Sequence, residues 1–344
     1  MAALDNYWYR PNKLVWLLLP LSWLYCLVVY IRRKLYQLHV IKSFTAQVPV
    51  VVVGNIVAGG SGKTPLLIGL CEYVSARGYR PGVVSRGYGG SYSGIRQVSE
   101  SDDAIIVGDE PLMIKQRAGV PVVVSADRVA AVEYLLDNND CDIVFSDDGL
   151  QHYRMRRNIE LAVIDVNRGL GNGFCLPAGP LREKSTRLQE VDMVVYNGKP
   201  TDASGVLVQR SGNIQTKCFY QLKITKIQRL NSKECRVLSD FAKTKTHAIA
   251  GIGNPSRFFG QLEAEGLSLE QHTFSDYHAY RQDDFSGWST DCIIMTEKDA
   301  VKCRNLILPD AWVVIVSSQF SAALASALDE ILMPLMTGSG SARQ

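Results

Sequence analysis

A glycine-rich segment after an apolar run has the residue types that bind the phosphates of a nucleotide. It consists of Gly59, Gly60, Ser61, Gly62, Lys63 and Thr64. The glycines allow a tight turn in which successive backbone N–H groups point at an anion. The lysine can reach the terminal phosphates, and the threonine can place its hydroxyl on Mg²⁺ while it begins a helix. We therefore predict an ATP site in a P-loop, and the alternative is a glycine-rich turn that binds no nucleotide.

The segment departs from the usual P-loop pattern at one position. The motif G-x-x-x-x-G-K-[ST] requires a glycine five residues before Gly62, and Val57 stands there. This departure makes the motif less specific, but the order of strand, glycines, Lys-Thr and helix is kept. The phosphate-binding mechanism therefore remains available to the segment.

A pair of carboxylates follows another apolar run further along the chain. Asp147 and Asp148 come directly after "CDIVFS", and His152 follows four residues later. A P-loop ATPase needs an acidic residue at the end of a neighbouring strand to hold its metal ion. Alone, two adjacent carboxylates have a structural role as often as a functional one. Together with the P-loop they predict a Mg²⁺ site, with Thr64 as a further ligand.

The segments around these residues predict the elements that position them. The β-branched run "VPVVVVGNIV" precedes the P-loop, as expected for a strand buried on both faces of a parallel sheet. "TPLLIGLCEYVSARG" has helical spacing and stops at Gly78. Strands and helices continue to alternate as far as "VDMVVYN". This alternation predicts an α/β fold with a P-loop NTPase-like, doubly wound, mostly parallel sheet and a ligand crevice at the carboxyl ends of the strands.

The pattern of polar and apolar residues changes several times along the chain, and these changes predict the domain organisation. "KCFYQLKITKIQRL" alternates polar and apolar residues, which is typical of antiparallel strands, and a second α/β pattern follows it. The predicted parts are an N-terminal membrane-associated helix (1–43), a P-loop core (44–215), a two-stranded linker (216–238), a smaller C-terminal α/β lobe (239–336) and a disordered tail (337–344).

The N-terminal segment is apolar enough to interact with a membrane. Residues 14–31 carry no charge, and Arg32, Arg33 and Lys34 follow them. Eighteen such residues just suffice to cross a bilayer core, and the tryptophans and tyrosines of the segment fit an interfacial helix equally well. A cleaved signal peptide and a buried core helix are the alternatives. The basic cluster favours a cytoplasmic location of the large domain.

Composition and charge exclude several other classes of function. The net charge is only +3, and no run of basic residues alternates with aromatic ones, so we predict no nucleic-acid partner. The eight cysteines form no C-x-x-C pair and have no histidine near enough to complete a zinc box. They are typical of reduced thiols in a cytosolic compartment.

A series of motifs, in fixed order, points to one family. "GNIVAGGSGKTP", "SRGYGG", "VGDEPLMI", "ADR", "DDGLQHYRM", "LPAGPLRE", "AGIGNPSRFF" and "TEKDAVK" follow the apolar helix. Together they resemble the tetraacyldisaccharide 4'-kinases, the lipid A 4'-kinases of Gram-negative bacteria, over nearly the whole chain to about residue 316. Members of this family also lack the first P-loop glycine, so the resemblance accounts for Val57.

The resemblance implies a reaction, its cofactors and its location. The γ-phosphoryl group of ATP would pass to the 4'-hydroxyl of a tetraacylated glucosamine disaccharide 1-phosphate, with Mg²⁺ as the metal. The substrate lipid and the inner membrane, at its cytoplasmic face, would be the partners, and no protein partner is implied. The basic residues that follow the helix, Arg32, Arg33, Lys34 and Lys42, would attract the anionic leaflet or only orient the helix.

The resemblance also implies which residues do the chemistry. Asp109 matches the catalytic aspartate, and Glu110 would assist at the metal. In relatives a histidine stands after "FxD", whereas this chain has Tyr277 and then His278. We favour His278 as the imidazole partner of the aspartate, because a tyrosine with a pKa near 10 is a poor partner at neutral pH. The alternative for "GDEP" is a solvated helix start, where acidic residues are favoured.

Further matches place other residues along the active site. Lys63 and Arg182 are expected to act on the phosphates. The expected substrate-side residues are Tyr88, Arg128, Gln151, His152 and Glu183. Glu297, Lys298 and Asp299 would cap a helix or contact the nucleotide. His247 and His272 are expected to be ordinary surface or strand residues.

Two other functions remain as alternatives at this point. The first is a membrane-anchored P-loop GTPase or regulatory switch, which should carry a guanine-reading N/T-K-x-D segment; "TEKD" is the nearest string and has glutamate in place of lysine. The second is a scaffold with an inactive nucleotide fold. The presence of Lys63, Thr64, Asp109, Asp147 and Asp148 argues against it.

Overall fold

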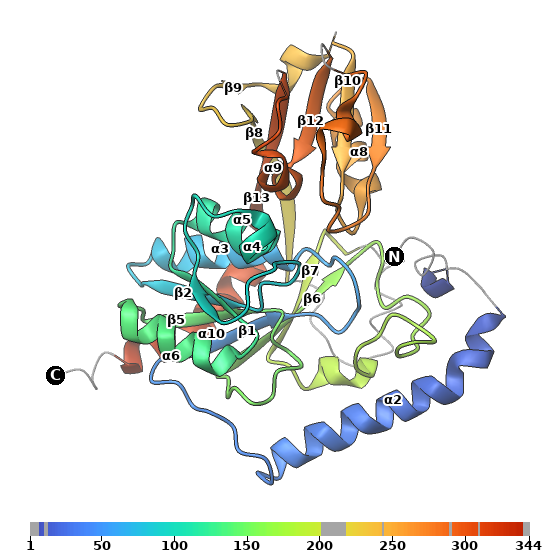
Figure 1. Ribbon diagram of the computed structural model, residues 1–344. Helices are drawn as coiled ribbons and strands as arrows, with labels where there is room; N and C mark the ends of the chain where they lie inside the picture. Colours follow the sequence, from blue (N-terminus) through green and yellow to red (C-terminus); the bar gives the residue numbers. More distant parts are fainter. Residues whose placement is uncertain are drawn as a thin grey trace.

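One continuous β-sheet runs through both lobes of the protein (Figure 1). The computed structural model describes residues 7–9, 13–200, 218–242, 244–288, 291–308 and 310–339. The strand order is β11-β10-β12-β13-β8-β7-β6-β1-β5-β2-β4-β3, and β9 pairs with β8. The predicted α/β fold with a mostly parallel sheet is confirmed.

The first lobe surrounds the P-loop strand. Its strands are β1 (Val50–Gly54), β2 (Pro81–Ser85), β3 (Ile95–Gln97), β4 (Val122–Ser125), β5 (Ile143–Asp147), β6 (Ile159–Asp165) and β7 (Met193–Asn197). β1 is the central strand and pairs in parallel with β5 on one side and β6 on the other. All five residues of β1 are buried, as its β-branched sequence predicts for a strand covered on both faces.

Helices cover both faces of this sheet. They are α3 (Lys63–Ser75), α4 (Ala104–Val107), α5 (Asp109–Ala118) and α6 (Arg128–Asn138), and a short 3-10 helix, η1, spans Ser185–Gln189. Side chains of α3 and α5 belong to one apolar core, and those of α6 belong to the core on the other face. Because β5, β1, β6 and β7 run parallel to one another, the loops at the carboxyl ends of β1, β5 and β7 meet at one edge of the sheet.

Two long antiparallel strands join the lobes. β8 (Phe219–Arg229) pairs along its length with β13 (Ala311–Phe320), whereas its partner within the predicted linker, β9 (Cys235–Arg236), is only two residues long. An antiparallel pair therefore does lie within 216–238, but the long strand that pairs with β8 between the lobes comes from the far end of the chain. The reason is that alternation of polar and apolar residues indicates a strand without identifying its partner.

The second lobe is a smaller α/β unit. It contains β10 (Thr246–Ala250), β11 (Leu269–Thr273), β12 (Cys292–Thr296), α8 (Pro255–Ala264), α9 (Glu297–Cys303) and the 3-10 helices η2 (Leu238–Phe241) and η3 (Gln282–Phe285). β10, β11 and β12 are parallel to one another, and β12 continues the parallel pairing to β13.

The last helix returns to the first lobe. α10 (Ala322–Ser339) places Leu324, Leu328, Leu332 and Met336 in the same core as α3 and α5. It was expected in the C-terminal lobe (239–336), but its apolar stripe is buried on the P-loop core. The tail predicted for 337–344 lies mostly outside the described residues.

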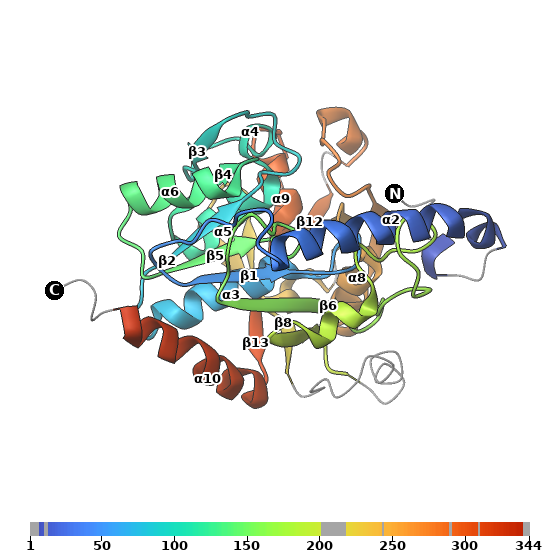
Figure 2. The ribbon, with the colours of Figure 1, turned by 90° about the horizontal axis from the view of Figure 1, so that it is seen from below.

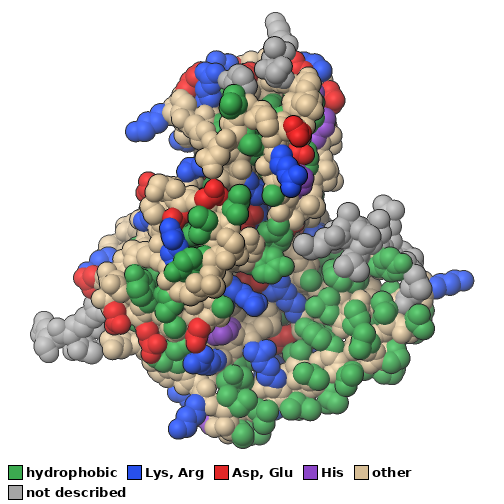
Figure 3. Space-filling model, in the orientation of Figure 1, with side chains coloured by type: hydrophobic (Ala, Val, Ile, Leu, Met, Phe, Trp, Pro, Cys, Tyr) green, Lys and Arg blue, Asp and Glu red, His purple; other side chains and the backbone are tan. Residues whose placement is uncertain are grey.

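The N-terminal helix lies along the first lobe. α2 (Leu14–Gln37) runs beside the body of the lobe (Figures 1 and 2). Several of its large apolar side chains are exposed. In the space-filling view, hydrophobic side chains gather over α2 at the lower right (Figure 3). By length and composition, one helix among the described residues, Val15–Gln37, could cross a membrane.

Candidate active site

The P-loop has the geometry of a phosphate cradle. Gly62 has a φ of 86°, and α3 begins at the next residue. The Asn55 side chain donates to the Gly59 carbonyl at 3.2 Å and to the Ser61 hydroxyl at 3.0 Å, which braces the turn from inside. A Cβ added at Gly62 would collide with the Asn197 amide and the Tyr220 hydroxyl. Only glycine fits here, both for its backbone conformation and for the lack of space.

The departure at Val57 has a structural explanation in this chain. Val57 is buried and forms an antiparallel bridge with Leu181, so the entry to the P-loop pairs with the "LPAGPLRE" segment. The next residue, Ala58, donates its N–H to the Pro180 carbonyl at 2.7 Å. A branched apolar side chain suits such a buried, extended position, and a flexible glycine is not required there.

The two predicted metal ligands meet the P-loop at the carboxyl end of β5. Asp148 has a positive φ of 47°, which turns its side chain away from the strand direction. Its carboxylate lies 3.6 Å from the Lys63 amine and 2.8 Å from the Arg182 guanidinium. Asp147 accepts a hydrogen bond from the Ser85 hydroxyl at 3.0 Å. The structure therefore brings together the lysine, both aspartates and Arg182.

The two adjacent aspartates have opposite electrostatic environments. Burial raises the pKa of Asp147 to about 7, and the charges of Glu110 and Asp148 add to this effect. Burial opposes ionisation of Asp148 too, but Lys63 and Arg182 outweigh it and hold the pKa of Asp148 at about 2. Asp148 is thus ionised at neutral pH. In the described part of the chain, Asp147 has no cation as close to its carboxylate as Lys63 and Arg182 are to that of Asp148.

The donor set at this edge fits a Mg²⁺ ion. Oδ1 of Asp147 and Oδ1 of Asp148 are buried and accept no hydrogen bond from the described residues. Mg²⁺ prefers hard oxygen ligands and is usually held by one or two carboxylates together with nucleotide phosphates. Thr64 is buried at the start of α3, directly after Lys63, whose amine lies 3.6 Å from Asp148.

Asp109 begins α5 and faces the second lobe. Only 4% of Asp109 is exposed; Oδ1 accepts the Glu110 backbone N–H at 2.8 Å, and Oδ2 accepts no hydrogen bond from the described residues. Lys298 Nζ is 3.8 Å from this free oxygen, donates to Glu110 at 3.0 Å, and donates to Asp276 at 2.9 Å. Burial raises the pKa of Asp109 to about 6, and the charge of Lys298 limits the rise.

Lys298 lines the cleft between the lobes, whereas Thr296 caps α9. Lys298 is on α9 of the second lobe, and its three acidic neighbours come from α5 and from the loop that follows β11. These neighbours raise the pKa of Lys298 well above its usual range, although burial acts in the opposite direction. Asp299 accepts the Gly251 backbone N–H and the Tyr280 hydroxyl, and it has an internal, structural role.

The structure does not bring His278 to Asp109. Nε2 of His278 is 3.0 Å from Asp284, and its ring packs against Phe274 and Tyr280. Tyr277 takes the position beside the acidic cluster instead, with a φ of 68° and the Lys298 amine 4.5 Å from its ring centroid. The predicted pairing of His278 with Asp109 did not allow for the left-handed backbone of Tyr277. This backbone conformation directs the side chains of Tyr277 and His278 to different sides.

We expect His278→Ala to preserve most of the phosphoryl transfer rate and to lower the melting temperature, because its imidazole supports the packing of the second lobe. General acid–base groups contribute about 10²-fold or more to the rate. A loss of that size in a folded variant would therefore indicate that His278 is the catalytic partner of Asp109. Tyr277→Phe serves as the companion variant, with transfer and thermal unfolding measured for both.

The predicted substrate-side residues divide into buried and open positions. Tyr88 is 60% exposed and packs its ring against Tyr277. Arg128 is buried and donates to the Asp147 carbonyl at 2.8 Å, so it supports the end of β5. Burial, with the charges of Arg128 and Arg157, lowers the pKa of His152 to about 4.

Glu183 has internal partners that account for its charge. It accepts hydrogen bonds from the Gln151 amide at 2.8 Å and from the Tyr153 hydroxyl at 2.6 Å, and it lies 3.6 Å from Arg187. Only 4% of the residue is exposed. Glu183 and Gln151 therefore fasten the "DDGLQH" segment to the "GPLRE" segment and orient the neighbouring Arg182.

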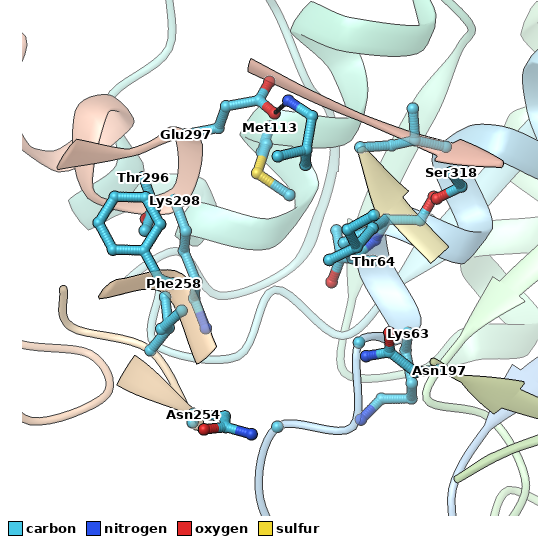
Figure 4. A pocket seen from close by; sticks show the side chains of 18 of the residues that line it. Lys63, Thr64, Met113, Asn197, Asn254, Phe258, Thr296, Glu297, Lys298 and Ser318 are labelled. Carbon is cyan, nitrogen blue, oxygen red and sulfur yellow. Dashed lines mark hydrogen bonds between the residues drawn. The ribbon is translucent and has the colours of Figure 1, made fainter. Parts of the chain in front are cut away.

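A cleft between the lobes contains the P-loop. Its lining includes Lys63, Thr64 and Ser318 on the side of the core and Asn254, Phe258, Thr296, Glu297 and Lys298 on the side of the second lobe. These groups face one another across the cavity (Figure 4). Phe258, Ile252 and Val314 supply an apolar wall beside the charged phosphate end, which is the mixture of surfaces that a nucleotide requires.

Sequence reasoning missed a group that connects the second lobe to the P-loop. Asn197, at the end of β7, donates to the Ser61 carbonyl at 3.1 Å and accepts from Arg257 of α8 at 2.7 Å. Arg257 also lies 3.4 Å from Asp165, and Gly253 packs directly on Gly60. A polar residue at the carboxyl end of a predicted parallel strand, as in "VDMVVYN", is the signal that could have identified Asn197.

A P-loop at the carboxyl end of a central parallel strand, with a carboxylate pair beside it and a second lobe across the cleft, defines a nucleotide-dependent P-loop enzyme. The comparisons with known proteins identify the family. The model of the family described as Tetraacyldisaccharide-1-P 4'-kinase matches residues 14–333. The chain belongs to this family.

Relatives match over their full length. The chain is 42% identical over 335 residues to the tetraacyldisaccharide 4'-kinase of Methylobacillus flagellatus, covering 97% of this chain and 96% of the relative. It is 45% identical to that of Shewanella baltica, with 96% of each chain covered. A crystal structure of LpxK from Aquifex aeolicus in complex with ATP has a TM-score of 0.75 and 25% identity, covering 93% of this chain and 99% of the other.

Proposed function

We propose that this protein transfers the γ-phosphoryl group of ATP to the 4'-hydroxyl of a tetraacylated glucosamine disaccharide 1-phosphate, in the biosynthesis of lipid A. Membership of the tetraacyldisaccharide 4'-kinase family supports the reaction. The single structural observation that carries the proposal is the position of Asp109, whose unbonded carboxylate oxygen lies buried beside Lys298 and Glu110, with Glu110 and Lys298 lining the same cleft as the P-loop lysine.

Asp109 acts as the base in this proposal. Its carboxylate takes the proton of the sugar hydroxyl as the new bond from oxygen to phosphorus forms and the bond to the ADP oxygen breaks. A hydroxyl loses its proton only as this attack proceeds, so a carboxylate with a pKa of about 6 can accept it. Lys298 keeps the carboxylate ionised and oriented, which makes it a positioning residue.

Lys63 and Arg182 neutralise charge on the phosphates. Both already contact the carboxylate of Asp148, so their cationic groups are held at the P-loop before a nucleotide enters. Thr64, Asp147 and Asp148 would hold Mg²⁺, which when bound neutralises phosphate charge. Glu110 is paired with Lys298 at 3.0 Å, so an additional role at the metal requires that this ion pair open.

The decisive experiment measures transfer of labelled γ-phosphate from Mg-ATP to a tetraacyl disaccharide 1-phosphate in detergent micelles. We expect a labelled lipid product, and no product when EDTA removes the metal. Hydrolysis of ATP without labelling of the lipid would contradict the kinase and support the regulatory switch.

We also propose that α2 lies in the membrane interface at the cytoplasmic face of the inner membrane. One side of the helix is held to the body: Ser22 donates to the Cys175 carbonyl at 2.8 Å, Tyr25 donates to the Arg182 carbonyl at 3.0 Å, and Arg33 pairs with Glu190. These contacts are spread along the helix, and spanning a bilayer would break them. The opposite side carries exposed aromatic and aliphatic residues suited to the headgroup level.

The double variant Trp16→Ser and Trp23→Ser should bind vesicles of anionic phospholipid at least about tenfold more weakly. The reason is that each aromatic side chain that becomes buried in the membrane contributes about 1.5–3 kcal/mol to binding. The two residues are 71% and 67% exposed. Ile307→Ser, which alters a residue that is 79% exposed on the second lobe, is the matched control and should not change binding. Cosedimentation with vesicles measures both, and equal binding of the double variant would contradict the interfacial role.

A further inference from the structure

A cluster of imidazole and carboxylate groups lies on the outer strands of the second lobe. β10 and β11 are paired in parallel, with His247 opposite Glu270 and Ile249 opposite His272. Because residues at positions i and i+2 of a strand face the same side, His247, Glu270 and His272 project from one face of the sheet. These strands are at the end of the sheet furthest from the P-loop core (Figure 1).

The ligand atoms of the cluster are close enough to share one ion. His247 Nδ1 is 3.0 Å from His272 Nε2, and Glu270 carboxylate oxygens lie 3.7 Å from the first ring nitrogen and 3.8 Å from the second. Zinc–nitrogen bonds of 2.0–2.1 Å place two ligands of a tetrahedral ion about 3.3 Å apart. Shifts of about 0.5 Å would therefore bring all three atoms to bonding distance.

The surroundings orient the imidazoles as metal ligands. Nε2 of His247 is 2.9 Å from the carboxylate of Asp291, an arrangement that keeps the proton on Nε2 and leaves the lone pair of Nδ1 directed at His272. Trp288 stacks on His247 with ring centroids 4.6 Å apart and an interplanar angle of 11°, and it also contacts His272. Only 1% of the His247 side chain is exposed, so its ring is fixed in place.

We propose that His247, Glu270 and His272 form a binding site for a borderline divalent transition-metal ion, with Zn²⁺ as the best match, on the outer edge of the second lobe. Two imidazoles and one carboxylate are a common ligand set for such ions. Asp291 orients His247 from behind. In the metal-free protein, Nε2 of His272 donates its proton to Nδ1 of His247 in a hydrogen bond. When the ion binds, His272 changes tautomer and carries its proton on its own Nδ1. Its Nε2 is then free to bind the ion, and no proton is released.

The charges that face the site are compatible with a cation. Lys245 lies 3.8 Å from Glu270 and 3.2 Å from Asp291, but its side chain is 66% exposed and can turn towards solvent. A bound ion would fasten the edge strand β11 to β10 and thereby stabilise the second lobe.

The test is a Zn²⁺ titration of the full-length protein after removal of metals with a chelator. A Cys235→Ser background removes the exposed thiol, and excess Mg²⁺ occupies the carboxylates beside the P-loop. Competition with a chromophoric zinc indicator gives the stoichiometry and the affinity. We expect one Zn²⁺ per chain in this background, and a higher melting temperature with Zn²⁺ than without it.

Variants assign the binding to the cluster. His272→Ala and Glu270→Gln should each weaken Zn²⁺ binding at least about tenfold, and Asp291→Asn by about 10–100-fold. The Glu270 side chain is 53% exposed, so Glu270→Gln should leave the fold intact. This variant tests the site even if His272→Ala does not fold. His39→Ala, which alters an exposed histidine on the other lobe, is the control. Absence of saturable binding, or binding that Glu270→Gln and Asp291→Asn leave unchanged, would overturn the proposal.

Discussion

Asp109→Asn should reduce phosphoryl transfer by about 10²–10⁴-fold, the range that general-base catalysis contributes, while ATP binding stays near that of the native protein. The asparagine keeps the size of the side chain but cannot accept a proton from the sugar hydroxyl. Asp109 makes none of the contacts that hold the P-loop and Lys63, so we expect its charge to have little effect on nucleotide affinity. The measurements are kcat for lipid phosphorylation and ATP affinity by titration calorimetry.

The same substitution should not destabilise the fold. Burial raises the pKa of Asp109 to about 6, above the usual value of a free aspartate. Its ionised form is therefore disfavoured in the native state, and stability falls as the pH rises through this value. At pH 8 the neutral asparagine should melt at the same temperature as the native protein or higher. Asp137→Asn, on the exposed side of α6, is the control. Normal turnover by Asp109→Asn would show that another group is the base.

The sequence predicted the core of the fold because local patterns determine it. The run before the P-loop is β-branched and apolar on both faces, and it became the central strand β1 with every residue buried. The alternation of strands and helices then specified a parallel sheet. The partner of β8 and the position of α10 were not predicted, since both depend on contacts between segments that are far apart in the sequence.

The sequence predicted which candidate residues lie close together where a motif fixes the backbone. Lys63, Asp147 and Asp148 meet as expected, because a P-loop and the next strand end must converge in a parallel sheet. The orientation of the Tyr277-His278 pair was not predictable, since one left-handed residue decides which side chain lies beside Lys298 and its acidic neighbours. Asn197 and Arg257 were missed because they support the P-loop through hydrogen bonds between distant segments, and no sequence motif indicates such hydrogen bonds.

Lys63→Ala should lower kcat for lipid phosphorylation by about 10²–10³-fold, as expected when one preorganised cationic donor to a charged transition state is removed. Its amine lies 3.6 Å from Asp148 and lines the cleft at the start of α3. Unlike Asp109→Asn, this substitution should also weaken ATP binding, because in the proposed role the lysine would contact phosphates in the ground state as well as in the transition state.

The loss of Lys63 should also change the charge balance at Asp148. Lys63 and Arg182 together hold the pKa of Asp148 at about 2 against the effect of burial. With the lysine removed, Arg182 alone compensates the carboxylate, and the metal-free variant should be less stable than the native protein. Mg²⁺ should then raise the melting temperature of Lys63→Ala more than that of the native protein, because the ion supplies the missing positive charge. Lys226→Ala, on an exposed position of β8, is the control. Equal stabilisation of both proteins by Mg²⁺ would contradict the assignment of Asp148 as a metal ligand.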